Sequence, residues 1–297
     1  MRIVTFRKWY FLFSAVLIVG SIAAVSVWGL RLGIDFTGGA LWEVRFPDGA
    51  PENAQVEENL SGTLESLTIQ RSDDNVLVLR FRDVPEDTHQ EALSKLSGIG
   101  KVEELRFDSV GPTIGAELKR SGAIAVALGL LAIALYIAWA FRKASRPISS
   151  WQYGTVTAAV ALFHDVLIPL GAFAAFGHFL GMEANTPFIA AILTVLGFSV
   201  HDTIIVFDRI RENLRRFAGD PFEEIVAHSV RQTFVRSLNT SLTVLFAVAA
   251  VWYFGGVAIA PFAATLFVGI AAGTYSSIFV ASMGLIELQS WLRKRRA

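Results

Sequence analysis

Cysteine is absent from the 297 residues of this chain. The absence excludes disulfide bonds and thiolate metal sites, so each folded part must be stable through its own core. Charge is also scarce, because Asp, Glu, Lys and Arg make up 18% of the sequence, whereas soluble domains keep about 25%. Hydrophobic residues make up 53%. This composition excludes an ordinary soluble protein and indicates a membrane protein.

The few charges are unevenly distributed. Residues 31–120 hold ten basic and seventeen acidic side chains, and the rest of the chain holds sixteen basic and nine acidic ones. The net charge of zero is therefore the sum of an acidic segment and a basic remainder. A segment of about 90 residues is long enough to form a hydrophobic core of its own.

Six long apolar runs dominate the remainder. A helix needs about 20 apolar residues to cross about 30 Å of hydrocarbon. Such runs lie at about 10–30, 121–141, 152–177, 187–207, 239–257 and 261–286. The first run follows basic residues, as a signal peptide does, but its length of about 20 residues exceeds a signal h-region. We therefore expect six transmembrane helices, of which the first is a retained anchor.

Basic residues gather in alternate connections between these runs. Three precede the first run, three lie in the loop 142–150 (Arg142, Lys143 and Arg146), six lie between 208 and 237, and four lie in the tail Arg293–Arg296. The opposite loops, near 178–186 and 254–260, contain none. Since basic residues favour the cytoplasmic side, both termini are predicted to be cytoplasmic and the acidic segment extracytoplasmic.

The acidic segment has the pattern of a folded α+β domain. Strands are expected at Ala40–Phe46, Leu67–Arg71, Asn75–Arg82 and Val102–Asp108, and helices at Pro51–Leu64 and Pro85–Leu96. This β-α-β-β-α-β order is that of a ferredoxin-like fold. The predicted division is 1–30 for the N-terminus and first helix, 31–118 for the extracytoplasmic domain, and 119–297 for the other five helices.

Motifs for catalysis and cofactor binding are lacking. The sequence contains no P-loop and no H-E-x-x-H pair, and no nucleophile motif accompanies the serines of the apolar runs. We therefore expect neither an enzyme nor a cofactor or metal site. Any energy that the protein uses directly would come from an ion gradient.

Asp202 is the most informative charge in the apolar runs. It lies about 7 Å along the helix axis from the middle of the run Phe188–Phe207, given a rise of about 1.5 Å per residue. Because a charge in hydrocarbon costs at least about 2.5 kcal/mol, such a carboxylate must be protonated or paired. A group that alternates between these states can relay protons, although a permanently hydrogen-bonded structural Asp is the alternative.

Arg236 is the expected partner of Asp202. Asn239 and Thr240 follow it at helical spacings of three and four, so the three residues share one face of the fifth run. A polar stripe of this kind faces protein or a wet cavity rather than lipid. In the alternative, Arg236 extends to the cytoplasmic interface as an anchor.

The pair His164-Asp165 in the third run has two open interpretations, a member of the relay or a structural polar contact. His201 precedes Asp202 but points about 100° away on a helix, so direct pairing is not expected. A carboxylate with an arginine, and without a cluster of oxygen ligands, favours H⁺ over Na⁺ as the coupling ion.

Two further motifs flank the apolar runs. The segment Gly33-Ile34-Asp35-Phe36-Thr37-Gly38-Gly39 predicts a tight turn with positive-φ glycines, in which Asp35 bonds nearby backbone N–H groups. After the fourth run, Asp208-Arg209 opens a basic amphipathic continuation of the helix. This continuation is either an interfacial anchor or a specific contact site.

These motifs together resemble the SecD/SecF family of bacterial protein-export proteins, within the resistance-nodulation-division superfamily. The resemblance rests on Gly33–Gly39, Phe163–Asp165, Gly197–Asn213 and Ser237–Ser241, and it extends over the whole chain. Its SecF members are half of a twelve-helix unit that SecD completes. In the family, an acid in the fourth span and an arginine 34 residues later form the proton-linked pair, and these positions are Asp202 and Arg236 here.

The resemblance implies a subunit of the bacterial inner membrane that uses the proton gradient to assist late preprotein translocation. It implies SecD as the direct partner, and the SecYEG channel, SecA and YajC or YidC as further partners. It also implies contacts with unfolded preprotein and with membrane lipids, and no binding of nucleic acid. The alternatives are a small-molecule or lipid exporter of the same superfamily, and an assembly factor whose charges only hold helices together.

Overall fold

The computed structural model describes residues 2–72, 75–142, 149–256 and 259–296. Lys143 and Arg146, which contribute to the charge pattern, lie outside the described residues. The chain divides into two compact units. We call Leu32–Ala123 the α+β unit, and Met1–Arg31 together with Ile124–Ala297 the helical unit.

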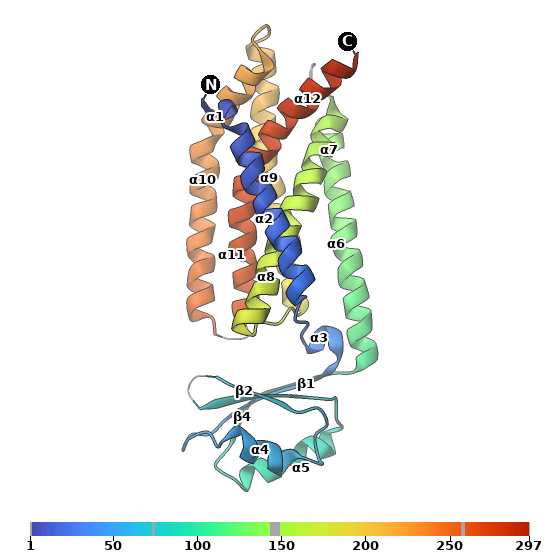
Figure 1. Cartoon of the computed structure of the whole chain (residues 1–297), viewed down its shortest axis with the longest axis vertical. Coiled ribbons are helices and arrows are strands. Elements are labelled where there is room, and N and C mark those ends of the chain that lie inside the picture. Colours follow the sequence, from blue (N-terminus) through green and yellow to red (C-terminus); the bar gives the residue numbers. More distant parts are fainter. Residues whose placement is uncertain (1, 73–74, 143–148, 257–258, 297) are drawn as a thin grey trace. The chain divides into compact units, whose positions relative to one another are not determined.

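The α+β unit contains four strands and two longer helices in the order predicted. They are β1 (Gly39–Arg45), α4 (Asn53–Leu60), β2 (Thr68–Arg71), β3 (Val76–Phe81), α5 (Glu86–Ser97) and β4 (Glu103–Val110). The sheet has the order β2-β3-β1-β4, and every pairing is antiparallel. Helices α4 and α5 cover one face of the sheet (Figure 1).

The core of the α+β unit lies between this sheet face and the two helices. Alternate residues of β1 and β3 point into it, as the period of two in a strand requires. Its members include Trp42 and Val44 of β1, Leu77 and Leu79 of β3, Val56 and Leu60 of α4, and Ala92 and Leu96 of α5, all of which are fully buried. The helix expected over Pro51–Leu64 is shorter than predicted, because it ends at Leu60 and Gly62 then turns with a φ of 89°.

The glycine motif contains a feature that the sequence did not predict. Ile34–Thr37 forms a single-turn helix, α3, with Gly33 as its extended N-cap and Asp35 in its first turn. Gly38 and Gly39 have φ values of 74° and 121°, which confirms the predicted positive-φ glycines. A Cβ atom at Gly38 would lie 2.8 Å from Pro112 Cα, and one at Gly39 would lie 2.8 Å from the Phe81 carbonyl oxygen. Only glycine fits at these two positions, where the backbone passes close to Pro112 and Phe81.

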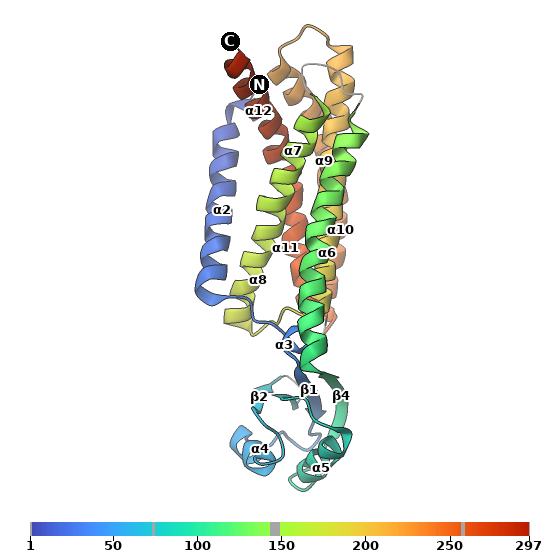
Figure 2. The ribbon, with the colours of Figure 1, turned by 90° about the vertical axis from the view of Figure 1, so that its right-hand side faces the viewer.

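The helical unit contains long helices that run roughly side by side (Figure 2). After the short α1 (Arg2–Thr5) they are α2 (Arg7–Trp28), α6 (Pro112–Ala140, which begins in the α+β unit), α7 (Ser150–Val160), η1 (Ala161–Val166), α8 (Leu167–Leu180), α9 (Thr186–Arg216), α10 (Phe222–Phe254), α11 (Ala260–Tyr275), η2 (Ser276–Ala281) and α12 (Ser282–Arg296). The elements η1 and η2 are π-helical turns that continue their neighbours without a break.

Five helices of the described chain are long and apolar enough to cross a membrane: α2, α6, α9, α10 and the run Ala260–Arg295. The predicted third span falls on α7, η1 and α8, of which His164–Leu180 is apolar but shorter. The π-helical turn at residues 161–166 divides this run. Five of the six predicted spans therefore correspond to helices of sufficient length, and the third stays a prediction.

Helix α9 lies inside the helical unit, where it contacts α10, α11, η1 and η2. Half of its most apolar window is buried, whereas the corresponding share is 6% for α6 and 11% for α2 and α10. Small residues allow this close packing. A Cβ atom at Gly269 of α11 would lie 2.3 Å from Val195 of α9, and one at Gly273 would lie 2.8 Å from Ser199 Cβ. Packing through small residues is typical of helices in membranes.

Candidate functional site: buried carboxylates between helices

Many buried polar side chains of the helical unit lie where η1, α9, α10, α11 and η2 meet. Ten of them are at most 7% exposed: His164, Asp165, Ser199, Asp202, Thr203, Ser237, Ser241, Thr274, Ser276 and Ser277. A polar group buried away from water costs free energy unless it has an internal partner. Almost all of these side chains accordingly hydrogen-bond one another or a nearby backbone carbonyl.

Asp165 is the centre of the first group, which we call the Asp165 cluster (His164, Asp165, Ser199 and Ser276). Ser199 Oγ donates to Asp165 Oδ2 at 2.5 Å, and Ser276 Oγ donates to Asp165 Oδ1 at 2.7 Å. His164 Nδ1 lies 3.0 Å from the same Oδ1. Both carboxylate oxygens therefore have partners from two other elements, α9 and η2.

Two more hydroxyl groups extend the Asp165 cluster along α9. Ser277 Oγ donates to the Ser199 carbonyl oxygen at 2.9 Å and lies 2.8 Å from Thr203 Oγ1. Within the cluster, His164 Nε2 is buried and has no hydrogen-bond partner among the described residues. The imidazole thus has one nitrogen on the carboxylate and one nitrogen unused.

The two π-helical turns supply the residues that meet in this cluster. His164 and Asp165 belong to η1, and Ser276 and Ser277 belong to η2. A π-helical turn contains an extra residue relative to an α-helix, shifts the side chains that follow, and is often found at functional sites. Both irregular turns lie in otherwise regular apolar helices and contact α9.

Asp202 lies on α9 and is fully buried. Its Oδ2 accepts a hydrogen bond from Ser241 Oγ of α10 at 3.2 Å, and Thr274 Oγ1 of α11 donates to the same Ser241 Oγ at 2.7 Å. In the described part of the chain, Asp202 Oδ1 has no hydrogen-bond partner. Ionising a buried carboxylate that has a single hydroxyl donor costs free energy. The Asp202 side chain therefore points into the protein.

His201 approaches Asp202 more closely than the sequence predicted. Its Nδ1 lies 4.0 Å from Asp202 Oδ1, at the outer limit of an ion pair, although the His201 side chain is 65% exposed and Asp202 is not exposed at all. The two side chains leave the helix in different directions, as expected, but their tips approach one another. At this distance the imidazole does not hydrogen-bond to the carboxylate.

Arg236 is not within ion-pair distance of Asp202 in the part of the chain that the structure describes. Arg236, Asn239 and Thr240 of α10 are all exposed, whereas Ser237 and Ser241 on the adjacent face are buried. The predicted polar stripe therefore exists, but it points out of this chain. Thr240 Oγ1 donates a hydrogen bond to the Arg236 carbonyl oxygen on its own helix, at 2.9 Å.

Asp208 and Arg209 lie on the exposed C-terminal part of α9. Asp208 pairs with Arg211, and Arg209 Nη1 lies 2.8 Å from Glu212 Oε2. Both pairs join residues three positions apart on one helix, which contributes only a few tenths of a kcal/mol. As predicted, the helix continues beyond the apolar run, and Asn213 joins it to α10 through hydrogen bonds of 2.9 Å to Ser229 and Gln232.

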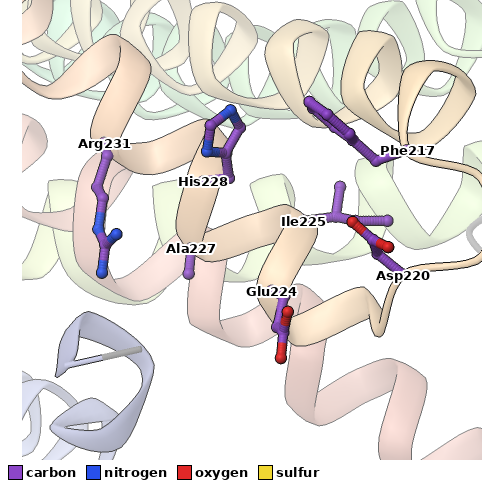
Figure 3. A pocket seen from close by; sticks show the side chains of 7 residues that line it. All are labelled: Phe217, Asp220, Glu224, Ile225, Ala227, His228 and Arg231. Carbon is purple, nitrogen blue, oxygen red and sulfur yellow. The ribbon is translucent and has the colours of Figure 1, made fainter.

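A separate pocket lies at the turn between α9 and α10 (Figure 3). It is lined by Phe217, Asp220, Glu224, Ile225, Ala227, His228 and Arg231. His228 faces Phe217 edge-on at 5.2 Å between ring centroids, and its Nε2 lies 2.9 Å from Gln232 Nε2. The pocket shares no residue with the buried carboxylates. We find no group of three or more His, Asp or Glu side chains suited to a metal among the described residues.

Sequence reasoning missed the hydroxyl groups that surround the two carboxylates. Ser199, Ser241, Thr274, Ser276 and Ser277 are unremarkable in the sequence, because serine and threonine are common in transmembrane helices. Only their positions on facing helices bring them to Asp165 and Asp202. One signal was available, namely that Ser199, Asp202 and Thr203 share a helical face at spacings of three and four.

These observations define a polytopic α-helical membrane protein with an additional α+β unit and buried carboxylates at the centre of its helices. Comparison with known proteins gives the family. Residues 89–291 match the family described as "Protein export membrane protein SecD/SecF, C-terminal". The chain belongs to the SecD/SecF family.

Relatives of similar length carry a consistent description. The chain is 43% identical to the protein translocase subunit SecF of Thermobaculum terrenum over 305 aligned residues, which cover 98% of this chain and 94% of the relative. It is 39% identical to the SecF subunit of Sebaldella termitidis, with 95% of this chain and 90% of the relative covered.

A solved structure has the same fold. The crystal structure of SecDF from Thermus thermophilus, described as a translocon-associated membrane protein, matches with a TM-score of 0.83 and 30% sequence identity over 98% of this chain. The chain spans 39% of the length of that SecDF protein. A structure of SecDF in a super-membrane-facing form matches with a TM-score of 0.69.

Proposed function

We propose that the chain is the SecF subunit of a bacterial protein-export machinery and that, together with SecD, it uses the proton gradient to drive late steps of preprotein translocation. The observation that carries the proposal is the fully buried Asp202, in a central apolar helix, with one hydroxyl donor and one unsatisfied oxygen. The near full-length SecF relatives give the biological context.

Asp202 is the proton-carrying group of this proposal. A permanent charge at this position would be costly in hydrocarbon, so the carboxyl group is neutral when it is sealed from water and ionises when a cation or water reaches it. Each proton that crosses the membrane releases about 2.3 kcal/mol per 100 mV. Repeated cycles therefore supply enough free energy to move a domain.

Arg236, Asn239 and Thr240 form the second part of the relay, and a SecD partner covers them. An exposed arginine and asparagine in a membrane-spanning helix are unfavourable against lipid. Their neighbours on α10 include large exposed apolar side chains, among them Val235 and Phe246. A partner protein that offers both apolar contacts and hydrogen-bonding groups satisfies the polar side chains on this face of α10 and covers their apolar neighbours. The SecDF relative, in which both halves are one chain, supports SecD as that protein.

His164 and Asp165 join the relay as a second buried acid. The imidazole and carboxylate lie 3.0 Å apart and are almost fully buried. His164 Nε2 has no partner, so it is available to a water molecule or a moving side chain. Ser199, on the helix α9 that also carries Asp202, and Ser276 of η2 donate the hydrogen bonds that hold Asp165 in place.

The topology of the proposal follows from hydropathy and the distribution of basic residues. Six helices span the inner membrane, the third being α7, η1 and α8 together, and both termini are cytoplasmic. The ferredoxin-like domain at 31–118 is extracytoplasmic.

This domain transmits motion to the preprotein. The SecYEG channel, SecA and YajC or YidC are the further partners. The glycine motif with Asp35 and the Asp208-Arg209 segment mark the two ends of the membrane region.

The proposal is tested by Asp202→Asn in proteoliposomes that contain this chain, its SecD partner and the translocation channel. The substitution keeps the size of the side chain but removes its titration, so proton-driven stimulation of export is expected to disappear. Asp220→Asn, in the exposed turn before α10, is the matched control and should retain activity. Full export stimulation in Asp202→Asn, with the protein folded and bound to SecD, would contradict the proposal.

A further inference from the structure

Ser241 and Thr274 connect Asp202 to the two helices that pack against α9. Ser241 Oγ of α10 donates to Asp202 Oδ2 at 3.2 Å, and Thr274 Oγ1 of α11 donates to Ser241 Oγ at 2.7 Å. Ser241 is 1% exposed and Thr274 is 7% exposed. The two hydroxyl groups thus form a short chain across three helices that ends on the carboxyl group.

Each hydroxyl group in this chain has a second acceptor within reach. Ser241 Oγ lies 2.9 Å from the Ser237 carbonyl oxygen on its own helix. Thr274 Oγ1 lies 2.8 Å from the Ile270 carbonyl oxygen on its own helix. A hydroxyl group has one hydrogen and two lone pairs. It can therefore donate in only one of the two directions at a time, and it can accept while donating elsewhere.

We propose that Ser241 and Thr274 are positioning residues whose hydrogen bonds reverse direction with the protonation state of Asp202. When Asp202 is ionised, Thr274 donates to Ser241, and Ser241 donates to Asp202. When Asp202 is protonated, its O–H group donates to Ser241 Oγ, and both hydroxyl hydrogens turn to the backbone carbonyls of their own helices. The O–H bond of Asp202 is the one covalent bond that changes, and its proton comes from and returns to water.

The surroundings of Asp202 make the hydrogen-bonded hydroxyl groups of Ser241 and Thr274 important. Within the described residues, its one hydrogen bond is from Ser241, and its closest basic group is His201 Nδ1 at 4.0 Å from the other oxygen. A backbone N–H group in place of Ser241 would favour only the ionised form, and a carbonyl group would favour only the protonated form. A hydroxyl group serves both, so Asp202 can load and release a proton without leaving its place.

This inference rests on the proposed function for its purpose, but its geometry can be tested separately. The variants are Ser241→Ala and Thr274→Val, with Thr274→Ser as the conservative rescue. Thr265→Val is the matched control, because Thr265 is also buried on α11 and donates only to the Pro261 carbonyl oxygen. Each is measured as the full chain with its SecD partner.

Two readouts are used. The first is the pH profile of export stimulation, and the second is infrared titration of the Asp202 carboxyl band, which is assigned by its loss in Asp202→Asn. Hydrogen bonds to a charged acceptor are stronger than those between neutral groups, so removing the donor disfavours the ionised form. Ser241→Ala is expected to move both midpoints to higher pH by about one unit, and Thr274→Val to move them less in the same direction.

Thr274→Ser and Thr265→Val should titrate like the wild type. If Ser241→Ala and Thr274→Val also titrate like Thr265→Val while Asp202→Asn is inactive, the inference is overturned and the proposed function stands. If instead Asp202→Asn supports export, the proposed function fails, and the infrared midpoints of Ser241→Ala and Thr274→Val still decide whether the two hydroxyl groups control the protonation of Asp202.

Discussion

Two aspartates in the same helical unit have different surroundings. Both oxygens of Asp165 accept hydrogen bonds, from Ser199 and Ser276, and His164 Nδ1 lies 3.0 Å from Oδ1. Asp202 accepts one hydrogen bond, and its second oxygen is unsatisfied. A carboxylate with several donors is held in place, whereas one with a single hydroxyl donor is free to change its protonation state at lower cost. Stability is therefore expected to depend more on Asp165, and proton coupling more on Asp202.

The first prediction, at the residue scale, concerns Asp165→Ala. The substitution removes the common acceptor of two buried hydroxyl groups and one imidazole. An unsatisfied buried donor costs about 1–3 kcal/mol, so the midpoint of thermal unfolding in detergent should fall clearly. Asp165→Asn retains one acceptor oxygen, so its unfolding midpoint should fall less. Unchanged unfolding of Asp165→Ala would show that these hydrogen bonds contribute nothing to stability.

At the scale of elements, α9 and α11 determine how closely the buried carboxylates are held. Gly273 of α11 faces Ser199 of α9, and Ser199 donates to Asp165. The space at Gly273 is therefore part of the geometry of the Asp165 cluster. The π-helical turn η2 begins three residues later and presents Ser276 to the same carboxylate.

The second prediction is that Gly273→Ala destabilises the helical unit. The new Cβ atom would lie 2.8 Å from Ser199 Cβ, and overpacking of this kind costs about 1–3 kcal/mol. Gly197→Ala on α9 is the control, because a Cβ atom there meets nothing within 4 Å. Unfolding midpoints of the two variants should separate, with Gly197→Ala near the wild type. Equal midpoints would mean that α11 moves away from α9 without cost.

At the scale of the whole molecule, the exposed face of α10 bears on the proposed contact with SecD. The polar stripe of Arg236, Asn239 and Thr240 lies on the surface of α10. Only 11% of the most apolar window of this helix is buried within the chain. Polar groups on an open helix face suit a protein interface in the membrane better than lipid. This face of α10 is where we expect a SecD partner to bind.

The third prediction uses the absence of cysteine. A photoactivatable crosslinker attached to Asn239→Cys is uniquely placed, since the chain has no other cysteine. It should capture SecD in membranes that contain both proteins. The same reagent at Val19→Cys, which is 66% exposed on α2, is expected to capture lipid instead. Capture of SecD from Val19 but not from Asn239 would place the partner on another face.

Much of this molecule was predictable from the sequence. Five of the six predicted spans, the β-α-β-β-α-β order and the positive-φ glycines at Gly38 and Gly39 correspond to features of the structure. Hydropathy, strand alternation and glycine conformation are local properties, because each depends on residues close together in the chain. The burial of Asp202 was also predictable, since a charge inside a long apolar run must face the protein.

Tertiary structure alone determined which groups meet. Ser241 and Thr274 reach Asp202, and Ser199 and Ser276 reach Asp165, because α9, α10, α11 and η2 pack together at positions far apart in the chain. It also determined that Arg236 points outward in the isolated chain. The direction of a side chain depends on how its helix is rotated against its neighbours, and π-helical turns change that rotation in the middle of a helix. No local pattern of residues encodes that rotation.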